Sequence, residues 1–217
     1  MGLAARPTQS RPKGAPGGIL WRAEQVEESG KEGTMARVRY VATTEAHGDA
    51  RKVFAQMEER GSAILNLHRA LANSPNTLRN FMRLGNSMLF HGVLSPALRE
   101  LAVLRIAQMT GADYEWAHHV PIARQVGIGE EQIAGLKGWH TSPYFDERQR
   151  TVLRYAESVT SAVTVPDEVF REVRAHLSEA EVVELTLVVG YWGLVARLLV
   201  ALKIDVEPSF AQYLPPE

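Results

Sequence analysis

Residues 111–123, GADYEWAHHVPIA, bring two histidines, a glutamate and a tyrosine into one short run between apolar segments. Glu115 and His119 are four residues apart, so on a helix they share a face, where a carboxylate can fix the tautomer of an imidazole. Tyr114 and His118 form a second pair with the same spacing, about 100° round the helix. These pairs predict either proton-transfer chemistry or a polar contact between packed helices.

A further carboxylate, Glu100, lies on the helix predicted before this run, with apolar residues at offsets of three, four and seven along the same stripe. A carboxylate is rarely buried without a partner. Glu100 is therefore either an acid, base or anchor with a shifted pKa, or one half of a buried ion pair with Arg105 or Arg197.

A metal site is the rival chemistry for these side chains. Glu100, Glu115, His118 and His119 supply enough donors for a set of two histidines and one carboxylate. Adjacent histidines, however, project from different helix faces, and the spacing matches no standard zinc signature. We therefore expect no metal and no cofactor.

Arg197 stands in the strongly apolar run GYWGLVARLLVAL. Arginine stays charged when buried and then needs an anion, which could be Glu184, Glu100 or the carboxylate of a substrate. Alternatively, Arg197 extends its charged end to solvent at the helix edge. On the first interpretation Arg197 binds substrate, together with Trp116 and His118 beside the acid–base pair.

The elements that position these residues are predicted to be helices throughout. Ser95 and Pro96 indicate a helix start, with serine as the cap, and this helix is expected to end near Thr110. Ser178 and Glu181 have the capping-box spacing that opens a last, long helix. Further helices are expected over 113–126, 129–137, 146–162 and 166–176. No segment shows the alternation of a half-buried strand, so the fold class is all-α.

The domain organisation follows from composition. Residues 1–37 are rich in Gly, Pro and charge, so we expect a disordered N-terminal extension. The alternatives are an over-extended start before Met35, or a short docking arm built on Ile19, Leu20 and Trp21. A helical domain is expected over 38–207 and a C-terminal tail over 208–217. A short similarity between the segments starting at Leu94 and Leu177 indicates two similar helical halves.

Composition also excludes several classes of function. A formal net charge of −1 leaves no excess of positive charge, so we expect no nucleic-acid partner. Glu184 and Arg197 interrupt the longest apolar run, and the N-terminus lacks an apolar signal segment, so we expect no membrane span and a cytoplasmic location. The chain has no cysteine, which removes disulfides and thiol chemistry.

The stretch LSPALRELAVLRIAQMTGADYEWAHHVPIARQVGIGEEQI resembles the core of the carboxymuconolactone decarboxylase family, whose members include alkylhydroperoxidase D. With its flanking segments, the resemblance covers about residues 38–207. It implies an all-helical, AhpD-like fold and homo-oligomers, either trimers or hexamers, with sites near subunit contacts.

The resemblance also implies residue roles. In the peroxidase branch, a relay of Glu, two Cys, Tyr and His would fall on Glu100, Ala112, Tyr114, Glu115 and His119, so both thiol positions are lost. This rules out Cys-dependent peroxidase activity. In the decarboxylase branch, glutamate and histidine occupy the positions of Glu115 and His119.

These observations predict a cofactor-independent acid–base enzyme acting on a small carboxylated or lactone-type compound, by decarboxylation or a related proton transfer. His119 would transfer the proton, Glu115 would orient the imidazole of His119, and Glu100 and Tyr114 would extend the relay. The alternative is a non-catalytic oligomeric binding or scaffold protein in which these side chains satisfy one another. An apolar cavity open to Glu115 and His119 would favour the enzyme.

Overall fold

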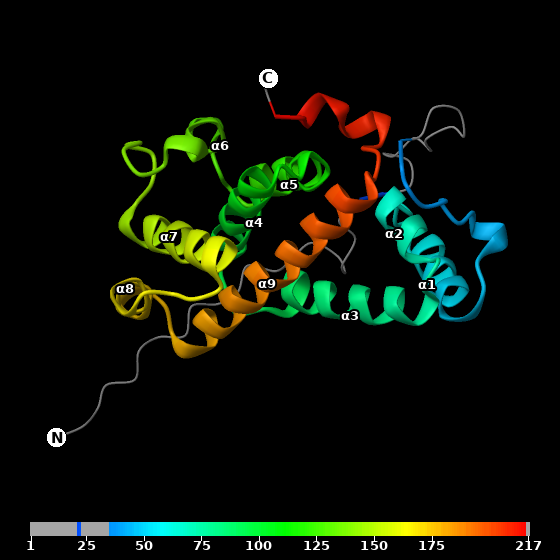
Figure 1. The fold of residues 1–217 in the computed structure, drawn as a ribbon, viewed down its shortest axis with the longest axis horizontal. Coiled ribbons are helices and arrows are strands. Elements are labelled where there is room, and N and C mark those ends of the chain that lie inside the picture. The colour runs from blue at the N-terminus through cyan, green and yellow to red at the C-terminus, as the bar shows by residue number, and fades with distance from the viewer. Residues whose placement is uncertain (1–20, 23–34, 216–217) are drawn as a thin grey trace.

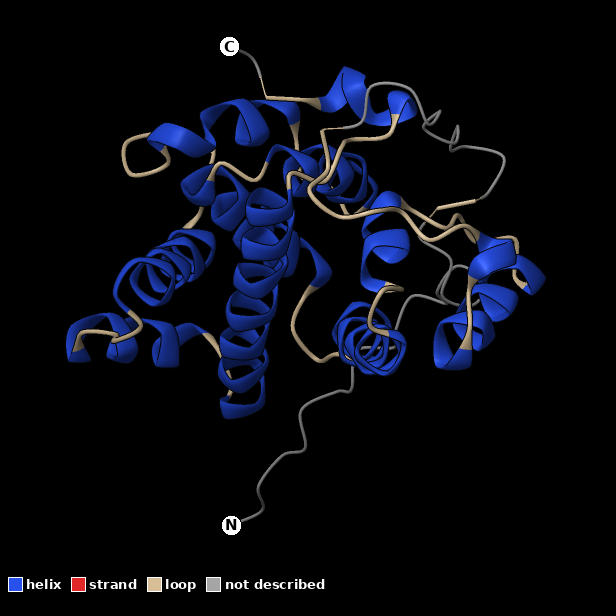
Figure 2. Ribbon diagram, turned by 45° about the vertical axis from the view of Figure 1, so that its right-hand side comes forward, coloured by secondary structure: helices blue, strands red, loops and turns tan. Residues whose placement is uncertain are grey.

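The computed structural model describes residues 21–22 and 35–215 (Figure 1). The expectations of a disordered extension, an early start and an arm that includes Ile19 and Leu20 fall mostly on residues outside these ranges. Within the described ranges the regular elements are helices, joined by loops and turns (Figure 2). One isolated antiparallel bridge pairs Arg22 with Ser62. The expected all-α fold is thus confirmed for the described residues.

The helices follow one another along the chain with short connections. In order, the 3-10 elements (η) and α-helices are η2 (Thr43–Glu45), α1 (Gly48–Glu59), α2 (Asn66–Leu71), α3 (Pro75–His91), α4 (Pro96–Thr110), α5 (Asp113–Gln125), α6 (Glu130–Gly135), η3 (Leu136–Gly138), α7 (Glu147–Ala162), α8 (Asp167–His176), α9 (Glu179–Leu202) and η4 (Pro208–Tyr213).

The predicted helix ends agree with the structure where a local signal sets them. In α9, Ser178 Oγ accepts from the backbone N–H of Glu181, and the Glu181 carboxylate accepts from that of Ser178 at 2.8 Å, as the capping box requires. Pro96 does open α4, although the Ser95 side chain makes no capping bond. The φ of Gly111 is 65°, a conformation that favours glycine, and it turns the chain from α4 into α5.

Helix α4 lies at the centre of the fold and packs against α5, α7 and α9. Nine of its fifteen residues are buried, so it has no solvent face over most of its length. Helix α9 crosses the face shown in Figure 1, with α7 and α8 on one side and α1 to α3 on the other. By length and composition α9 could span a membrane, but 44% of its most apolar window is buried inside the bundle.

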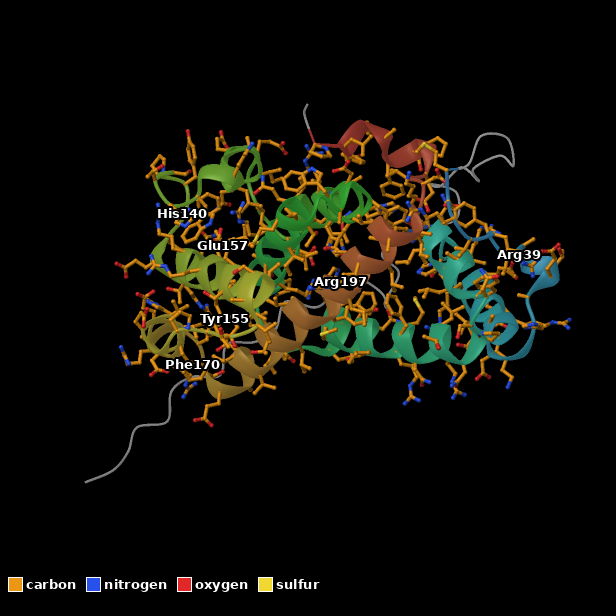
Figure 3. All side chains as sticks on the ribbon, viewed as in Figure 1. Arg39, His140, Tyr155, Glu157, Phe170 and Arg197 are labelled. Atoms are coloured by element: carbon orange, nitrogen blue, oxygen red, sulfur yellow. The ribbon has the colours of Figure 1, made fainter. Side chains whose placement is uncertain are left out.

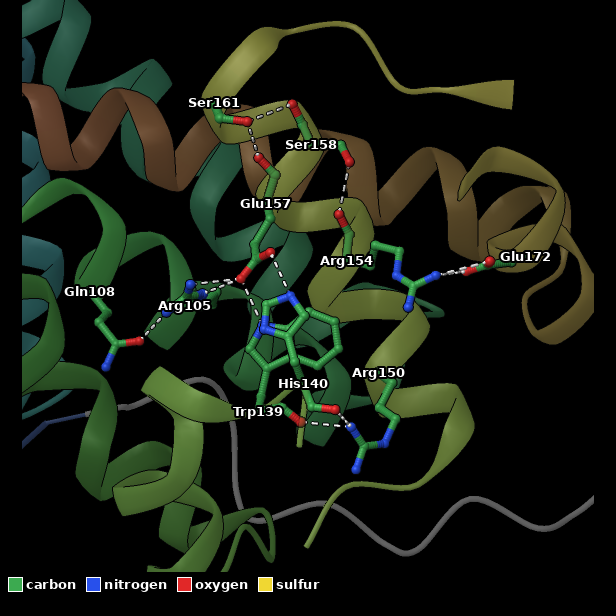
Figure 4. Close-up of polar contacts among 10 residues, drawn as sticks. All are labelled: Arg105, Gln108, Trp139, His140, Arg150, Arg154, Glu157, Ser158, Ser161 and Glu172. Carbon is green, nitrogen blue, oxygen red and sulfur yellow. Dashed lines mark hydrogen bonds and ion pairs between the residues drawn. The ribbon is translucent and has the colours of Figure 1, made fainter. Parts of the chain in front are cut away.

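Glu157 of α7 connects three elements on the side away from α1 to α3 (Figure 4). One of its carboxylate oxygens accepts from Arg105 of α4 and from the indole N–H of Trp139, each at 2.7 Å. Arg150 holds the same loop through the backbone carbonyls of Trp139 and His140, at 2.7 and 2.8 Å. These contacts hold α4 and α7 together. They fix the position of α4, whose opposite face packs toward α5 and α9.

Helix α3 meets α9 closely at Gly85. A Cβ at this position would lie 2.5 Å from Oη of Tyr191, whose hydroxyl donates to the Phe81 carbonyl at 3.1 Å. Glycine at this position therefore leaves the space that the end of the Tyr191 side chain occupies, and a larger residue would displace that side chain.

We predict that Gly85→Ala lowers the free energy of unfolding by about 1–3 kcal/mol, because the methyl group displaces Tyr191. Tyr191→Phe in the same chain should recover part of the loss by removing the clashing oxygen. The control is Gly138→Ala, since a Cβ there meets no atom within 4 Å. Chemical denaturation measures all three variants, and equal stability of the two Ala variants would contradict this account.

Candidate active site

A cavity of about 430 Å³ lies between the N-terminal helices α1 to α3 and the pair α5 and α9. Its walls are largely apolar, and its volume is within the range of small-molecule sites. Glu115 and His119 both line it. This is the arrangement that the enzyme hypothesis requires and that a filled polar contact would lack.

The imidazole of His119 is held on both nitrogens. Nδ1 lies 2.6 Å from Oε2 of Glu100, and Nε2 accepts from the indole N–H of Trp192 at 2.9 Å. Because an indole N–H can only donate, this geometry assigns the ring hydrogen of a neutral His119 to Nδ1, directed at Glu100. His119 has no nitrogen left over for a substrate unless one of these bonds breaks.

Glu100 has no solvent exposure and is the anchor of this group. Its other oxygen accepts from Arg99 Nε at 2.9 Å, and Arg99 also donates to the carbonyls of Met88 and Leu89. Burial opposes ionisation, but His119 and Arg99 outweigh it and hold the pKa of Glu100 below its usual range. The ion pair expected with Arg105 or Arg197 is therefore wrong: the partner is the neighbouring residue in the sequence.

Glu115 is 2% exposed, and neither of its carboxylate oxygens has a hydrogen-bond partner among the described residues. Burial, and secondarily the negative charge of Glu100, raises the pKa of Glu115 well above the usual value. This shift favours the neutral carboxylic acid over the carboxylate at the cavity wall. The expectation that Glu115 orients His119 is wrong, because Glu100 faces the imidazole from α4 and the side chain of Glu115 makes no bond to it.

Tyr114 and His118 belong to a second network, centred on Glu207. Tyr114 Oη donates to Glu207 Oε1 at 2.9 Å, and the backbone N–H of Asn66 donates to the same oxygen at 2.7 Å. His118 Nε2 lies 2.8 Å from Glu207 Oε2, and its ring stacks between those of Tyr114 and Phe210. Tyr114 therefore ties α5 to the C-terminal segment, and the expected extension of the His119 relay through Tyr114 is wrong.

Two of the three predicted substrate-binding residues lie away from the cavity. Trp116 packs in the core with Leu101, Leu104 and Val120. Arg197 is exposed on the face of α9 shown in Figure 3 and donates to the carbonyl of Gly193 at 2.6 Å. The alternative of an arginine with its charged end in solvent is thus confirmed. His118 does line the cavity, where Glu207 holds it.

Several residues of the site carry no signal at the level of sequence. Trp192 and Glu207 lie far along the chain from their partners, and only Arg99 is adjacent to the group it pairs with. Trp21, from the segment expected to be disordered, lines the cavity and meets Phe210 edge to face at 4.8 Å. In the described part of the chain, no group of three or more acidic or histidine side chains is arranged to hold a metal ion.

We predict that Glu115→Gln changes the pH dependence of stability. Between the ordinary glutamate pKa and the raised pKa in the fold, the folded chain binds a proton that the unfolded chain releases. Wild-type stability relative to Glu115→Gln should therefore fall with rising pH in that window, by up to about 1.4 kcal/mol per pH unit. Denaturant titrations from pH 5 to 8, with the exposed Glu59→Gln as control, measure this; parallel curves for all three proteins would refute a protonated Glu115.

Comparisons with known proteins give the family and the fold that this chain resembles. Residues 75–158 match the sequence model of the carboxymuconolactone decarboxylase family. The uncharacterized protein YdfG of Bacillus subtilis is 29% identical over 106 residues, which cover 48% of this chain and 72% of that protein.

Solved structures extend the likeness to most of the fold. A protein of unknown function from Agrobacterium tumefaciens has 26% identity and a TM-score of 0.59, over 68% of this chain and 96% of that one. The alkylhydroperoxidase AhpD core of an uncharacterized peroxidase-related protein from Ralstonia eutropha has 19% identity and a TM-score of 0.72, over 82% and 95%. The fold is thus AhpD-like, and within it residues 75–158 are similar to the carboxymuconolactone decarboxylase family, in a chain that has no cysteine.

Proposed function

We propose that this protein is a cofactor-independent enzyme that transfers a proton to or from a small organic compound bound in the cavity, with Glu115 as the reacting acid. The observation that supports this is a buried carboxylic acid, without a hydrogen-bond partner, on the wall of an apolar cavity. The family resemblance points to a carboxylated or lactone-type substrate and to decarboxylation as the reaction. Compared with the expectation from sequence, the proton-transferring role moves from His119 to Glu115.

The proposed chemistry uses Glu115 in its neutral form. When a β-keto acid loses CO2, the electron pair of the broken C–C bond stays on the substrate as an enolate. Glu115 then donates its proton to the enolate carbon and is left as a carboxylate, which regains a proton from solvent. A carboxylic acid kept neutral by an apolar site is suited to this task, since it can donate at a pH where an exposed glutamate cannot.

The buried group behind Glu115 has a positioning role in this proposal. Glu100 is held ionised by Arg99 and His119, and its negative charge helps to keep Glu115 protonated. The two carboxyl groups thus have pKa values shifted in opposite directions, which is the arrangement expected when one acts as an acid and the other as a fixed charge. His119, bonded on both nitrogens, fixes Glu100 relative to Trp192.

We predict that Glu115→Gln lowers kcat by about 100-fold or more on a substrate found by screening decarboxylation and lactone hydrolysis, because general acid catalysis contributes about that much. KM should change little, since the amide has nearly the shape of the neutral acid. The wild-type rate should fall as the pH rises through the raised pKa of Glu115, because Glu115 then loses its proton. His119→Ala is the comparison variant: a loss confined to His119→Ala, with Glu115→Gln still active, would return the role to His119.

We also keep the homo-oligomer as a proposal, and α9 supports it. The exposed residues Val183, Leu187, Gly190, Leu194 and Arg197 follow one another at alternating steps of four and three along one face, and Val183 and Leu187 are 60% and 48% exposed. Such spacing is typical of a helix that pairs with another helix. Positions 187 and 197, like 190 and 194, are equidistant from residue 192, so two copies can pair antiparallel. A hexamer would contain this twofold contact, and a trimer would not.

We predict that replacing both Leu187 and Leu194 by Arg reduces the mass of the assembly in size-exclusion chromatography with light scattering, because a positive charge at position 187 of one copy then faces Arg197 of the other. The control is Phe170→Arg, which changes a 44% exposed residue on α8 and should leave the mass unchanged. A monomeric wild-type protein, or equal dissociation of the control, would disprove this contact.

A further inference from the structure

The charged groups that line the cavity are unequal in sign. Among the described residues, Arg60, Arg79 and Arg83 line it, and Glu115, which is neutral when protonated, is the only acidic lining residue. His68 also lines it, but burial lowers the pKa of this histidine to about 4, so it is uncharged near neutral pH. A ligand in the cavity therefore meets more positive than negative charge from the described part of the chain.

Two of these three arginines have no anion of their own. Arg79 forms an ion pair with Asp49, with 3.2 Å between Nη1 and Oδ2. Arg60 and Arg83 make no ion pair or side-chain hydrogen bond with the described part of the chain, and both are exposed. Arg60 follows the last residue of α1 and Arg83 lies in the middle of α3, two helices that pack against each other. Two free guanidinium groups thus stand on adjacent helices at one cavity.

The rest of the wall defines what else the ligand must offer. Met57, Phe81, Met82, Leu89 and Ile122 supply apolar surface, and Gln56 and Asn86 are further polar lining groups. A guanidinium group has a planar set of donors that matches a carboxylate with two parallel hydrogen bonds. A ligand with a carboxylate and an apolar body would satisfy both parts of the wall.

We propose that Arg60 and Arg83 form an anion-binding rim that selects organic carboxylate ions with an apolar body. This proposal rests on the proposed function, because the reaction of the bound carboxylate is the one proposed above. The binding itself can be measured without turnover. Arg60 lies outside the segment that matches the family. On this proposal, the residues that select the ligand are different from those that transfer the proton.

The test is direct binding, followed by the intrinsic fluorescence of Trp21 and Trp192, both of which line the cavity. Phenylacetate and phenylacetamide are the probes, because they have nearly the same shape and differ in charge. Phenylacetate should bind with a Kd at least about tenfold lower, since a charge-assisted pair contributes roughly that much. Arg60→Gln and Arg83→Gln should each remove most of this preference and leave phenylacetamide binding unchanged.

The matched control is Arg51→Gln, which removes the same charge from α1 at a position that does not line the cavity. Equal affinity for the two probes would overturn the proposal, and so would an equal effect of Arg51→Gln. Competition by inorganic phosphate at the same concentration as phenylacetate would also overturn it, since the apolar body would then contribute nothing. Glu115→Gln separates the two proposals: it should abolish turnover and keep the preference for phenylacetate.

Discussion

Burial of an ionised carboxylate at the centre of the helical bundle is the constraint on which the rest of the structure depends. Glu100 has no solvent exposure, so its charge needs partners in fixed positions. Arg99 supplies a charge from the same helix, and His119 supplies a hydrogen bond from α5. Trp192 of α9 completes this series of hydrogen bonds by donating to His119. The packing of α4, α5 and α9 and the geometry of the site are therefore set by the same bonds.

Helix α5 is held from two sides by unrelated networks. His119 binds toward α4 and α9, whereas Tyr114 and His118 bind toward Glu207 in the C-terminal segment. Glu115 lies between these residues in the sequence and takes part in neither network. A helix fixed on both flanks can hold one unpaired acid against a cavity, where a loosely packed helix would rotate to hydrate it.

The sequence predicts the helices well and the partners of their side chains poorly, for a physical reason. Caps, prolines and Gly111 act locally, so the bounds of α4 and the start of α9 follow from a few residues. The spacing of Glu115 and His119 specifies a shared helix face, but not which neighbouring element approaches that face. Tertiary packing decides whether Glu100 or Glu115 becomes the partner of His119. It also decides the roles of Trp192 and Glu207. Arg197 shows the same limit. An apolar run predicts that a segment is helical and that most of it is buried, but the neighbouring helices determine which face of α9 stays exposed.

The cavity draws its walls from two stretches of chain with different roles. The acid and its buried support lie on α4, α5 and α9, whereas Trp21 and much of the wall around α1 and α2 precede residue 75, where the family match begins. Substitutions in that earlier stretch can reshape the cavity while leaving Glu115 and the charged groups behind it in place. The shape of the cavity can therefore change by small steps without disturbing the buried ion pair that holds α4, α5 and α9 together.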